Sequence, residues 1–166
     1  MSSTAPPRET EASACAGSGD ARQWTVEHKA IAFIDCCGFT AYTREHGDPA
    51  AVRLHLELRR HLEREAHLAD VHVVKWNGDG AMLAAEDTRA ALTCLYRAMI
   101  SLRRARLLPV RAGLSFGSVT AIDCDGLDFL GASVNRAAEL CSAAAPWQVR
   151  ADFGRQALHF RLHTPG

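Results

Sequence analysis

The sequence predicts an α+β domain in which helices pack on a mostly antiparallel sheet. Three observations lead to this fold class. Short apolar runs rich in Val, Ile and Phe alternate with longer amphipathic segments, turn signals join several of these runs into hairpins, and the composition is that of a globular protein, with 48% hydrophobic and 23% charged residues. The resulting order of strands and helices is close to the β-α-β-β-α-β arrangement of ferredoxin-like folds.

The chain of 166 residues has the length of one domain, or of one domain with a tail. Residues 1–23 are rich in Ser, Ala, Pro, Gly and Glu and show no apolar period, so we expect a disordered N-terminal tail. This stretch also lacks the apolar segment of a secretory signal. The folded domain is expected to span residues 24–166.

The first half of the domain is predicted to contain a strand, two helical segments and a hairpin. In chain order these are a buried strand over 29–37, a short helical stretch after Gly38, a helix over 50–68, and strands over 71–76 and 81–85. Asp48 and Pro49 are typical of the start of the long helix, in which Leu54, Leu58 and Leu62 form one apolar stripe. The sequence Asn-Gly-Asp-Gly between the two strands is a strong turn signal.

The second half is predicted to contain a helix, a second hairpin, another helix and a final strand. In chain order these are a helix over 88–106 capped by Asp87, strands over 110–115 and 118–122 joined through Phe116-Gly117, a turn at Asp125-Gly126, a helix over 133–143 before Pro146, and a strand over 148–151. The short stretch after the final strand is ambiguous between strand and loop.

Charge and cysteine content limit the partners and the compartment. Lys and Arg together number 19, as do Asp and Glu, so no overall basic field favours nucleic acid as a partner. No apolar run approaches the roughly 18 residues of a membrane span. The six cysteines include no CxxC pair, and the adjacent Cys36 and Cys37 suit neither an ordinary disulfide nor a metal knuckle. We therefore expect reduced thiols in a cytoplasmic protein that binds neither nucleic acid nor a membrane.

Two aspartates have positions that favour a role in chemistry. Asp35 lies at the end of a predicted buried strand, and Asp79 lies in the tight turn of the first hairpin. If these strands are neighbours in the sheet, both carboxylates can meet at one edge, where they suit Mg²⁺ or Mn²⁺ with substrate phosphates completing the shell. The alternative from the residues alone is that Asp79 is a turn residue and that Asp35 caps the segment after it.

Four segments combine glycines and polar residues at fixed spacing. They are Phe33-Ile-Asp35-Cys-Cys-Gly38-Phe39-Thr40, Lys75-Trp-Asn-Gly78-Asp79-Gly80, Arg111-Ala-Gly113-Leu-Ser-Phe-Gly117-Ser-Val119 and Asp128-Phe-Leu-Gly131-Ala-Ser-Val134-Asn135-Arg-Ala137-Ala138. In this order, over about residues 29–150, they resemble the signatures of class III nucleotidyl cyclases, the adenylate and guanylate cyclase catalytic domains. Each segment alone is a weak signal, but four in order with matching element types form a strong one.

The resemblance implies a cyclase homology domain and a set of site residues. These are Asp35, Asp79 and Cys36 for two divalent cations, Mg²⁺ or Mn²⁺, Lys75 and Asp128 for the base, Arg111 for a phosphate, and Asn135 for the ribose. The implied reaction is an in-line attack of the ribose 3′-hydroxyl on the α-phosphorus of a nucleoside triphosphate, which yields a 3′,5′-cyclic nucleotide and pyrophosphate. A Lys–Asp pair complements adenine better than guanine, so ATP is the expected substrate.

The resemblance further implies a homodimer with two composite sites. In the family, the metal-binding aspartates and the phosphate-binding arginine come from one protomer, and the base-reading pair and the asparagine come from the other. This chain carries both halves, so a symmetric dimer would contain two equivalent sites.

Glu139 departs from the family pattern. Four positions after the asparagine the family usually has an arginine that stabilises charge on the transferring phosphate, and a carboxylate there would repel phosphates. Arg136 follows Asn135 directly, so it points roughly 100° away on a helix and is a poor substitute. Phe116 stands where many relatives have a histidine, a change that affects packing more than chemistry.

Two other functions therefore remain beside an ATP cyclase. The domain resembles compact pyrimidine cyclases of antiphage defence systems, which convert UTP or CTP to cUMP or cCMP, and Trp76 or Tyr42 could fill the pocket around a smaller base. The second is a degenerate domain that binds a nucleotide or a partner without turnover, which Glu139 favours. A ferredoxin-like RNA-binding module is disfavoured, because the sequence lacks basic patches and exposed aromatic pairs on the central strands.

Overall fold

The computed structural model describes residues 24–123, 126–154 and 157–161. The predicted disordered tail, residues 1–23, lies outside the described residues. In chain order the elements are β1 (Trp24–Cys36), α1 (Phe39–His46), α2 (Asp48–Leu68), β2 (His72–Asn77), β3 (Gly80–Ala85), α3 (Thr88–Arg104), β4 (Val110–Asp123), β5 (Leu127–Leu130), α4 (Ala132–Ser142), β6 (Gln148–Asp152) and β7 (Ala157–Arg161). The ambiguous C-terminal stretch therefore contains a strand, β7, which pairs with β6.

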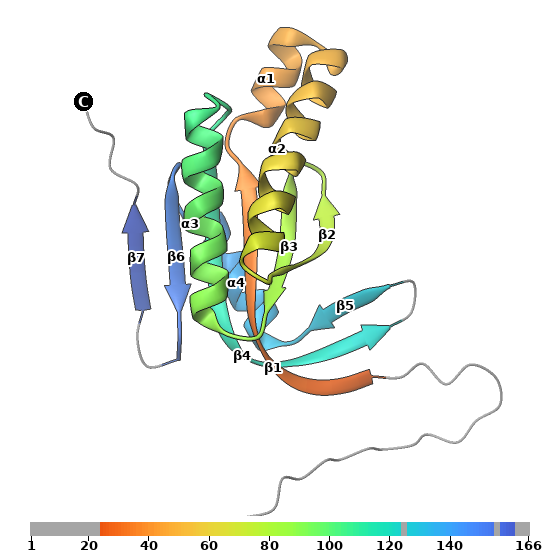
Figure 1. Ribbon diagram of the computed structural model, residues 1–166, viewed down its shortest axis with the longest axis vertical. Coiled ribbons are helices and arrows are strands. Elements are labelled where there is room, and N and C mark those ends of the chain that lie inside the picture. Colours follow the sequence, from red (N-terminus) through yellow and green to blue (C-terminus); the bar gives the residue numbers. More distant parts are fainter. Residues whose placement is uncertain (1–23, 124–125, 155–156, 162–166) are drawn as a thin grey trace, which may run out of the picture.

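A seven-stranded sheet forms the centre of the fold (Figure 1). Its hydrogen-bonded order is β2-β3-β1-β4-β6-β7, and β5 pairs with the last part of β4. β1 lies between β3 and β4 and is antiparallel to both, whereas β4 and β6 run parallel. The predicted α+β class, with a mostly antiparallel sheet and helices packed on it, is confirmed.

Helices cover both faces of the sheet (Figure 1). α2 and α3 pack on one face, where their apolar stripes meet alternate residues of β1, namely Ala30, Ala32 and Ile34, in the larger core. α4 packs on the other face, where Ile31 of β1 and Val134 belong to the smaller core. Because successive side chains of a strand point to opposite faces, the apolar run of β1 contributes to both cores.

Two glycines of β4 allow α4 to lie close to the sheet. A Cβ atom on Gly113 would lie 2.2 Å from the backbone oxygen of Ala137 and 2.2 Å from the backbone nitrogen of Cys141. A Cβ atom on Gly117 would lie 2.4 Å from Oγ of Ser133. A larger residue at either position would push the helix away from the sheet, so this glycine spacing sets the position of α4.

The predicted hairpin at Phe116-Gly117 is wrong. The chain continues through these residues as one strand of 14 residues, which pairs with β1 from Trp24 to Cys36. Gly117 makes room for α4 and does not have the positive φ of a turn glycine. The hairpin instead joins β4 to β5 near the predicted turn at Asp125-Gly126, and the sequence did not predict β5 because its four residues are too few to show a period.

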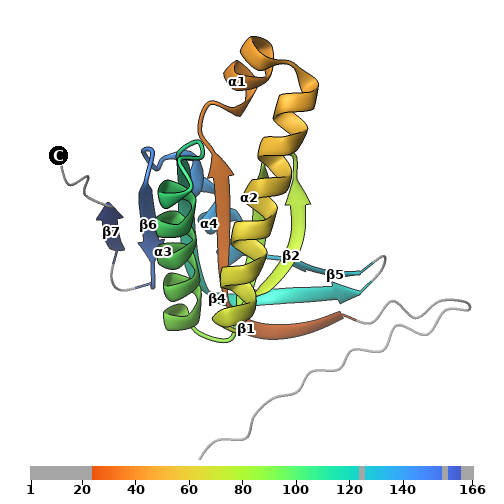
Figure 2. The same cartoon turned by 45° about the horizontal axis from the view of Figure 1, so that its top comes forward.

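α1 and the first turns of α2 project beyond the end of the sheet (Figure 2). α1 has no buried residues, so it adds little to either core.

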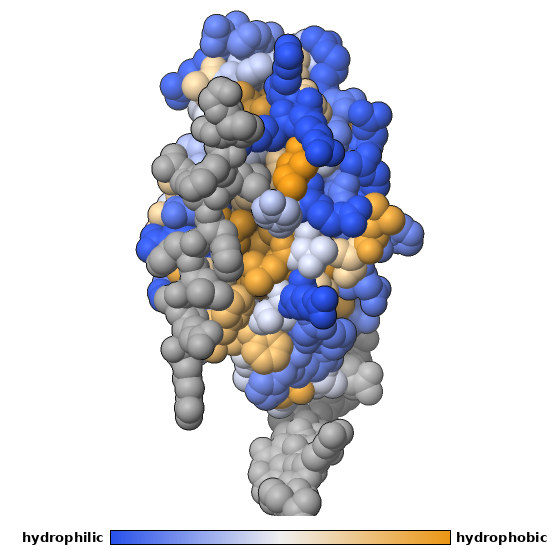
Figure 3. All heavy atoms as spheres, turned by 60° about the vertical axis from the view of Figure 1, so that its left-hand side comes forward, coloured by the Kyte–Doolittle hydropathy of each residue, from blue (hydrophilic) through white to orange (hydrophobic). Residues whose placement is uncertain are grey.

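The face in Figure 3 carries hydrophilic side chains over much of its area, with apolar side chains exposed between them. Among the described residues, no helix combines the length and the apolar character that crossing a membrane requires.

Candidate active site

Asp35 lies next to the turn that carries Asp79. β1 and β3 pair antiparallel, with Ile34 opposite Ala81, so Asp35 is level with Gly80 at the start of β3. A Cβ atom on Gly80 would lie 2.8 Å from the backbone oxygen of Ile34 and 3.4 Å from Oδ1 of Asp35, so the turn needs glycine to pass this close. β1 and β3 are therefore neighbours in the sheet, which is the condition under which Asp35 and Asp79 were expected to meet at one edge.

The Asp79 carboxyl is electrostatically coupled to Asp35. Burial raises the pKa of Asp79, and the negative charge of Asp35 adds to this shift. A divalent cation between the two carboxylates would relieve the repulsion, and carboxylate oxygens are the ligands that Mg²⁺ and Mn²⁺ prefer. No group of three or more His, Cys, Asp or Glu side chains in the described part of the chain could hold a metal ion. The pair alone would supply only part of the ligand shell of a divalent cation, so further ligands would have to come from outside these side chains.

The thiol of Cys36 does not suit the metal-binding position that was expected for it. The residue is 4% exposed and belongs to the larger core, whereas Asp35 precedes it on the opposite face of β1. Burial raises its pKa to about 12, so the sulfur stays protonated, and a soft sulfur is a poor ligand for Mg²⁺. The four described cysteines are free thiols, and Cys15 and Cys124 lie outside the described residues.

Arg111 lies directly opposite Asp35 in the pairing of β1 with β4. Its Nε and Nη2 atoms both donate to Oδ2 of Asp35, at 3.0 and 2.8 Å, and its Nη1 donates to the backbone oxygen of Ser142 at 2.9 Å. The residue predicted to bind phosphate thus holds a predicted metal ligand in the free protein. The sequence predicted that both residues belong to the site. It did not predict that they contact each other, because that contact depends on the register of β1 and β4.

Lys75 and Asp128 form an ion pair between strands that are far apart in the sequence. Nζ of Lys75 lies 2.6 Å from Oδ2 of Asp128, and Oδ1 of Asp128 accepts a hydrogen bond from the backbone N–H of Phe129 at 2.8 Å. A bulge in β2 lies between Val73 and Lys75, directly before the lysine of the pair. Bulges of this kind change the direction of neighbouring side chains. The two residues also line a pocket of about 430 Å³ with apolar walls that include Val73 and Leu127.

Asn135 and Glu139 share an exposed face of α4 with Ser142. Glu139 pairs with Arg136, whose Nη1 lies 3.3 Å from Oε2, and Arg136 also donates from Nε to Oδ2 of Asp152 at 2.8 Å. Arg136 is therefore held between two carboxylates. Its position supports the expectation that it does not replace the missing arginine.

Trp76 and Tyr42 do not line the pocket beside Lys75 in the same protomer. Trp76 lies on the other face of β2, against the larger core, and Tyr42 stacks on His46 within α1 with ring centroids 4.3 Å apart. Within one protomer, the structure thus contradicts the idea that either ring fills this pocket around a smaller base.

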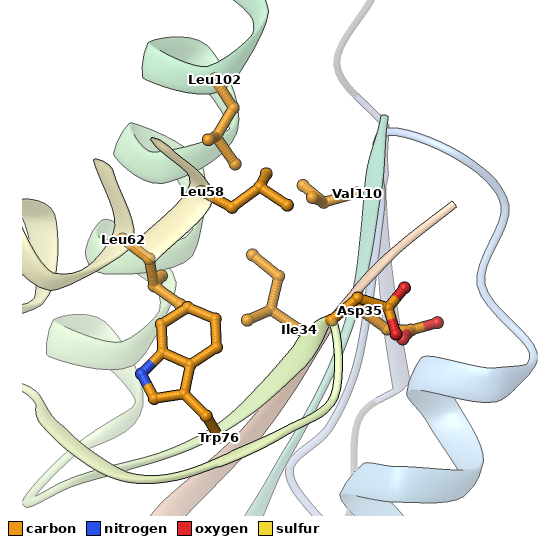
Figure 4. Close-up of a pocket in the computed structure, with 8 residues that line it drawn as sticks. Ile34, Asp35, Leu58, Leu62, Trp76, Leu102 and Val110 are labelled. Carbon is orange, nitrogen blue, oxygen red and sulfur yellow. The ribbon is translucent and has the colours of Figure 1, made fainter. Parts of the chain in front are cut away.

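A second, apolar cavity lies between α2, α3 and the end of β1 (Figure 4). Ile34, Leu58 and Trp76 are among its walls, and the carboxylate of Asp35 points away from it (Figure 4). Its volume of about 10 Å³ leaves room for no more than about one water molecule. This cavity is a gap in the core and not a nucleotide site.

Comparison with solved structures shows that cyclase catalytic domains share the fold of this chain. No protein-family model matches the sequence. The adenylyl cyclase CyaB from P. aeruginosa superposes with a TM-score of 0.68 and 18% identity, over 78% of each chain. A monomeric guanylyl cyclase domain of the RhoGC fusion protein from Blastocladiella emersonii gives 0.72 and 17%, over 79% of this chain and 83% of that one. The guanylyl cyclase Cya2 gives 0.66 and 20%, over 76% and 75%.

Curated relatives by sequence include uncharacterised proteins of Mycobacterium tuberculosis and Mycobacterium bovis. Each is 34% identical over 126 residues, which is 73% of this chain and 32% of the relative. The chain thus spans about a third of the length of these relatives. Their names record no activity, so the sequence likeness adds no function of its own.

Proposed function

The chain has the fold of the class III nucleotidyl cyclase catalytic domain, and we propose that it converts a nucleoside triphosphate, ATP in the first place, to a 3′,5′-cyclic nucleotide and pyrophosphate. The observation that carries the proposal is the cluster of Asp35, Asp79 and Arg111 at one end of the sheet. Two carboxylates and a guanidinium in one place provide for divalent cations and for phosphate oxygens.

The side chains of this cluster would divide the work of phosphoryl transfer. Asp35 and Asp79 would hold Mg²⁺ or Mn²⁺, which, when bound, neutralise charge on the triphosphate and lower the pKa of the attacking hydroxyl. Arg111 presents a planar fork of donors to phosphate oxygens once Asp35 no longer occupies it. Positioning and electrostatic stabilisation supply most of the rate in such reactions.

The Lys75–Asp128 pair supports a base with a ring acceptor beside an exocyclic amine. The ammonium of Lys75 would donate to the ring nitrogen, and the carboxylate of Asp128 would accept from the amine. Adenine and cytosine offer this pattern, whereas guanine and uracil offer a carbonyl oxygen and a ring N–H. The pocket of about 430 Å³ beside the pair has room for the larger of these two bases, as the proposal of ATP requires.

A second copy of the chain would complete the site. Exposed apolar side chains lie along the arm formed by β1, β4 and β5, and they are Trp24, Val26, Phe116, Leu127 and Leu130. A partner that covers this arm would remove apolar surface from water. We infer a homodimer in which the cluster at Asp35 of one protomer faces Lys75, Asp128 and Asn135 of the other.

The free thiols of the described chain suit a cytoplasmic location.

Incubation of the purified protein with each of the four nucleoside triphosphates and Mn²⁺ tests the proposed reaction. The expected products are 3′,5′-cyclic AMP and an equal amount of pyrophosphate from ATP. Cyclic CMP or cyclic UMP as the main product would favour the pyrimidine cyclase of an antiphage system. Nucleotide binding without pyrophosphate release from any triphosphate would identify the degenerate alternative.

Glu139→Arg is expected to raise the turnover rate roughly tenfold, because a donor that meets charge built up in the transition state contributes at least this much. The gain should appear in kcat more than in KM. Glu139→Gln is the matched control, since it removes the negative charge without adding a cation, and should give a smaller gain. An unchanged or lower rate in a folded Glu139→Arg dimer would show that another residue of this chain has taken over the role.

A further inference from the structure

Trp76 follows Lys75 in β2, and three residues of α2 hold its indole ring. His55 meets the ring edge to face, with the ring centroids 5.4 Å apart. Cζ of Arg59 lies 4.9 Å from the ring centroid, and Oε1 of Glu63 accepts a hydrogen bond from Nε1 at 3.3 Å. These three residues are four apart, so they share one face of α2 and form a continuous row of contacts along the ring.

These contacts support one another. Nε and Nη2 of Arg59 both donate to Oε1 of Glu63, at 3.2 and 3.0 Å. The guanidinium thereby keeps the carboxylate beside the indole N–H while its own charge lies over the ring. Trp76 also packs against the larger core, and Leu62, which likewise belongs to α2, lines the same small cavity as the ring (Figure 4).

The indole is also close to the turn that carries Asp79. Trp76 is the last but one residue of β2 and is paired with Ala81, and Asp79 lines the same small cavity as the ring. The pairing of β2 with β3 ends at Asn77 and Gly80. The two residues of the turn itself therefore lie outside the ladder and depend on their surroundings for their orientation.

The chain connects the two carboxylates through the helices. Asp35 leads through α1 into α2, and α2 contacts Trp76, which precedes the turn of Asp79 in β2. We propose that Trp76 is a positioning residue that fixes the Asp79 turn to α2 and so sets the geometry of the two carboxylates toward a divalent cation. This inference rests on the proposed function, which includes the metal site. A ring that only filled the core would not need three polar partners on one helix face.

Mn²⁺ binding to the nucleotide-free protein, followed by the EPR signal of free Mn²⁺, tests the proposal. Trp76→Leu should bind Mn²⁺ roughly tenfold more weakly, which is typical of losing a group that orients a metal ligand. Trp76→Phe keeps a ring beneath Arg59 and should recover most of this loss. Arg59→Met and Arg60→Met form a matched pair, because Arg60 instead contacts Glu57 at 2.5 Å, and only Arg59→Met should weaken binding.

Hydrogen exchange without metal separates this role from the metal site itself. Trp76→Leu should speed exchange of the backbone amides of Gly78, Asp79 and Gly80, and Arg60→Met should leave them unchanged. Wild-type Mn²⁺ affinity in a folded Trp76→Leu protein overturns the proposal, and so does unchanged exchange at the turn. A wild-type protein that binds no Mn²⁺ would contradict the metal site of the proposed function, and the exchange rates would still decide whether Trp76 holds the turn.

Discussion

Asp79→Asn should reduce cyclic nucleotide formation by roughly 10³-fold or more, and Asp35→Asn should do the same, because metal stabilisation of the transition state amounts to several kcal/mol. Each substitution keeps the shape of the side chain and removes the charge that holds the cation. Initial rates of product formation at saturating Mn²⁺ measure the effect. Full activity in either folded variant would exclude the two-carboxylate metal site.

The thermal midpoint of Asp79→Asn distinguishes lost chemistry from lost structure. The folded-state pKa of this carboxyl is raised, so its ionised form costs stability at every pH above the folded pKa, and the cost disappears as the pH falls below the unfolded value. At neutral pH the neutral amide should therefore match or exceed the wild-type midpoint. Asp70→Asn is the matched control, because Asn tolerates the φ of 55° at this position, and it should retain full activity.

Arg111→Gln should lower turnover by about 10²-fold, which is typical of losing one donor to a reacting oxygen, and should at the same time tighten Mn²⁺ binding in the absence of nucleotide. The second effect follows from the two hydrogen bonds that Arg111 gives to Oδ2 of Asp35. Because the guanidinium and the cation compete for one carboxylate, its removal leaves Asp35 free for the metal. EPR titration and initial rates measure the two effects separately.

Arg150→Gln is the control for the structural part of the Arg111 result. Arg150 also donates to a carbonyl near the end of α4, from Nη1 to the backbone oxygen of Ala143 at 3.0 Å, as Arg111 does to that of Ser142. Its replacement retains the pair of Arg111 with Asp35, so Mn²⁺ affinity should stay unchanged. Weaker Mn²⁺ binding in Arg111→Gln would mean that the arginine orders Asp35 for the cation and does not compete with it.

The sequence predicted the elements with a strong local signal. The apolar run of β1, the stripe of α2 and the Asn-Gly-Asp-Gly turn are local patterns, and the structure has each of them where it was expected, within a few residues. The N-terminal part of β1 was missed because its residues are mostly exposed, with apolar and polar side chains alternating, and depend on pairing with the second half of β4. Gly117 was wrongly interpreted as a turn residue for a related reason. The glycine is needed because α4, which lies later in the chain, packs closely against β4 there.

For the candidate site, too, the sequence predicted the positions that depend on local patterns and missed the contacts that depend on distant parts of the chain. Residues within a motif could be placed from the sequence, because the spacing in a turn or at a strand end fixes their position. The contacts of Arg111 with Asp35 and of Arg59 with Trp76 could not, because they depend on strand register and on how α2 crosses β2. Cys36 was assigned to the metal through the family resemblance, whereas alternation along β1 turns its thiol into the core.

Mixing two inactive variants tests the composite site most directly. Asp35→Ala and Asn135→Ala each damage both sites of their own homodimer, but a mixed dimer contains one intact site. After subunit exchange of equal amounts, about one quarter of the wild-type activity should return, because half of the dimers are mixed and each has one working site of two. A mixture that remains as inactive as its parents, with exchange verified by mass spectrometry of differently tagged chains, would contradict a site shared between two protomers.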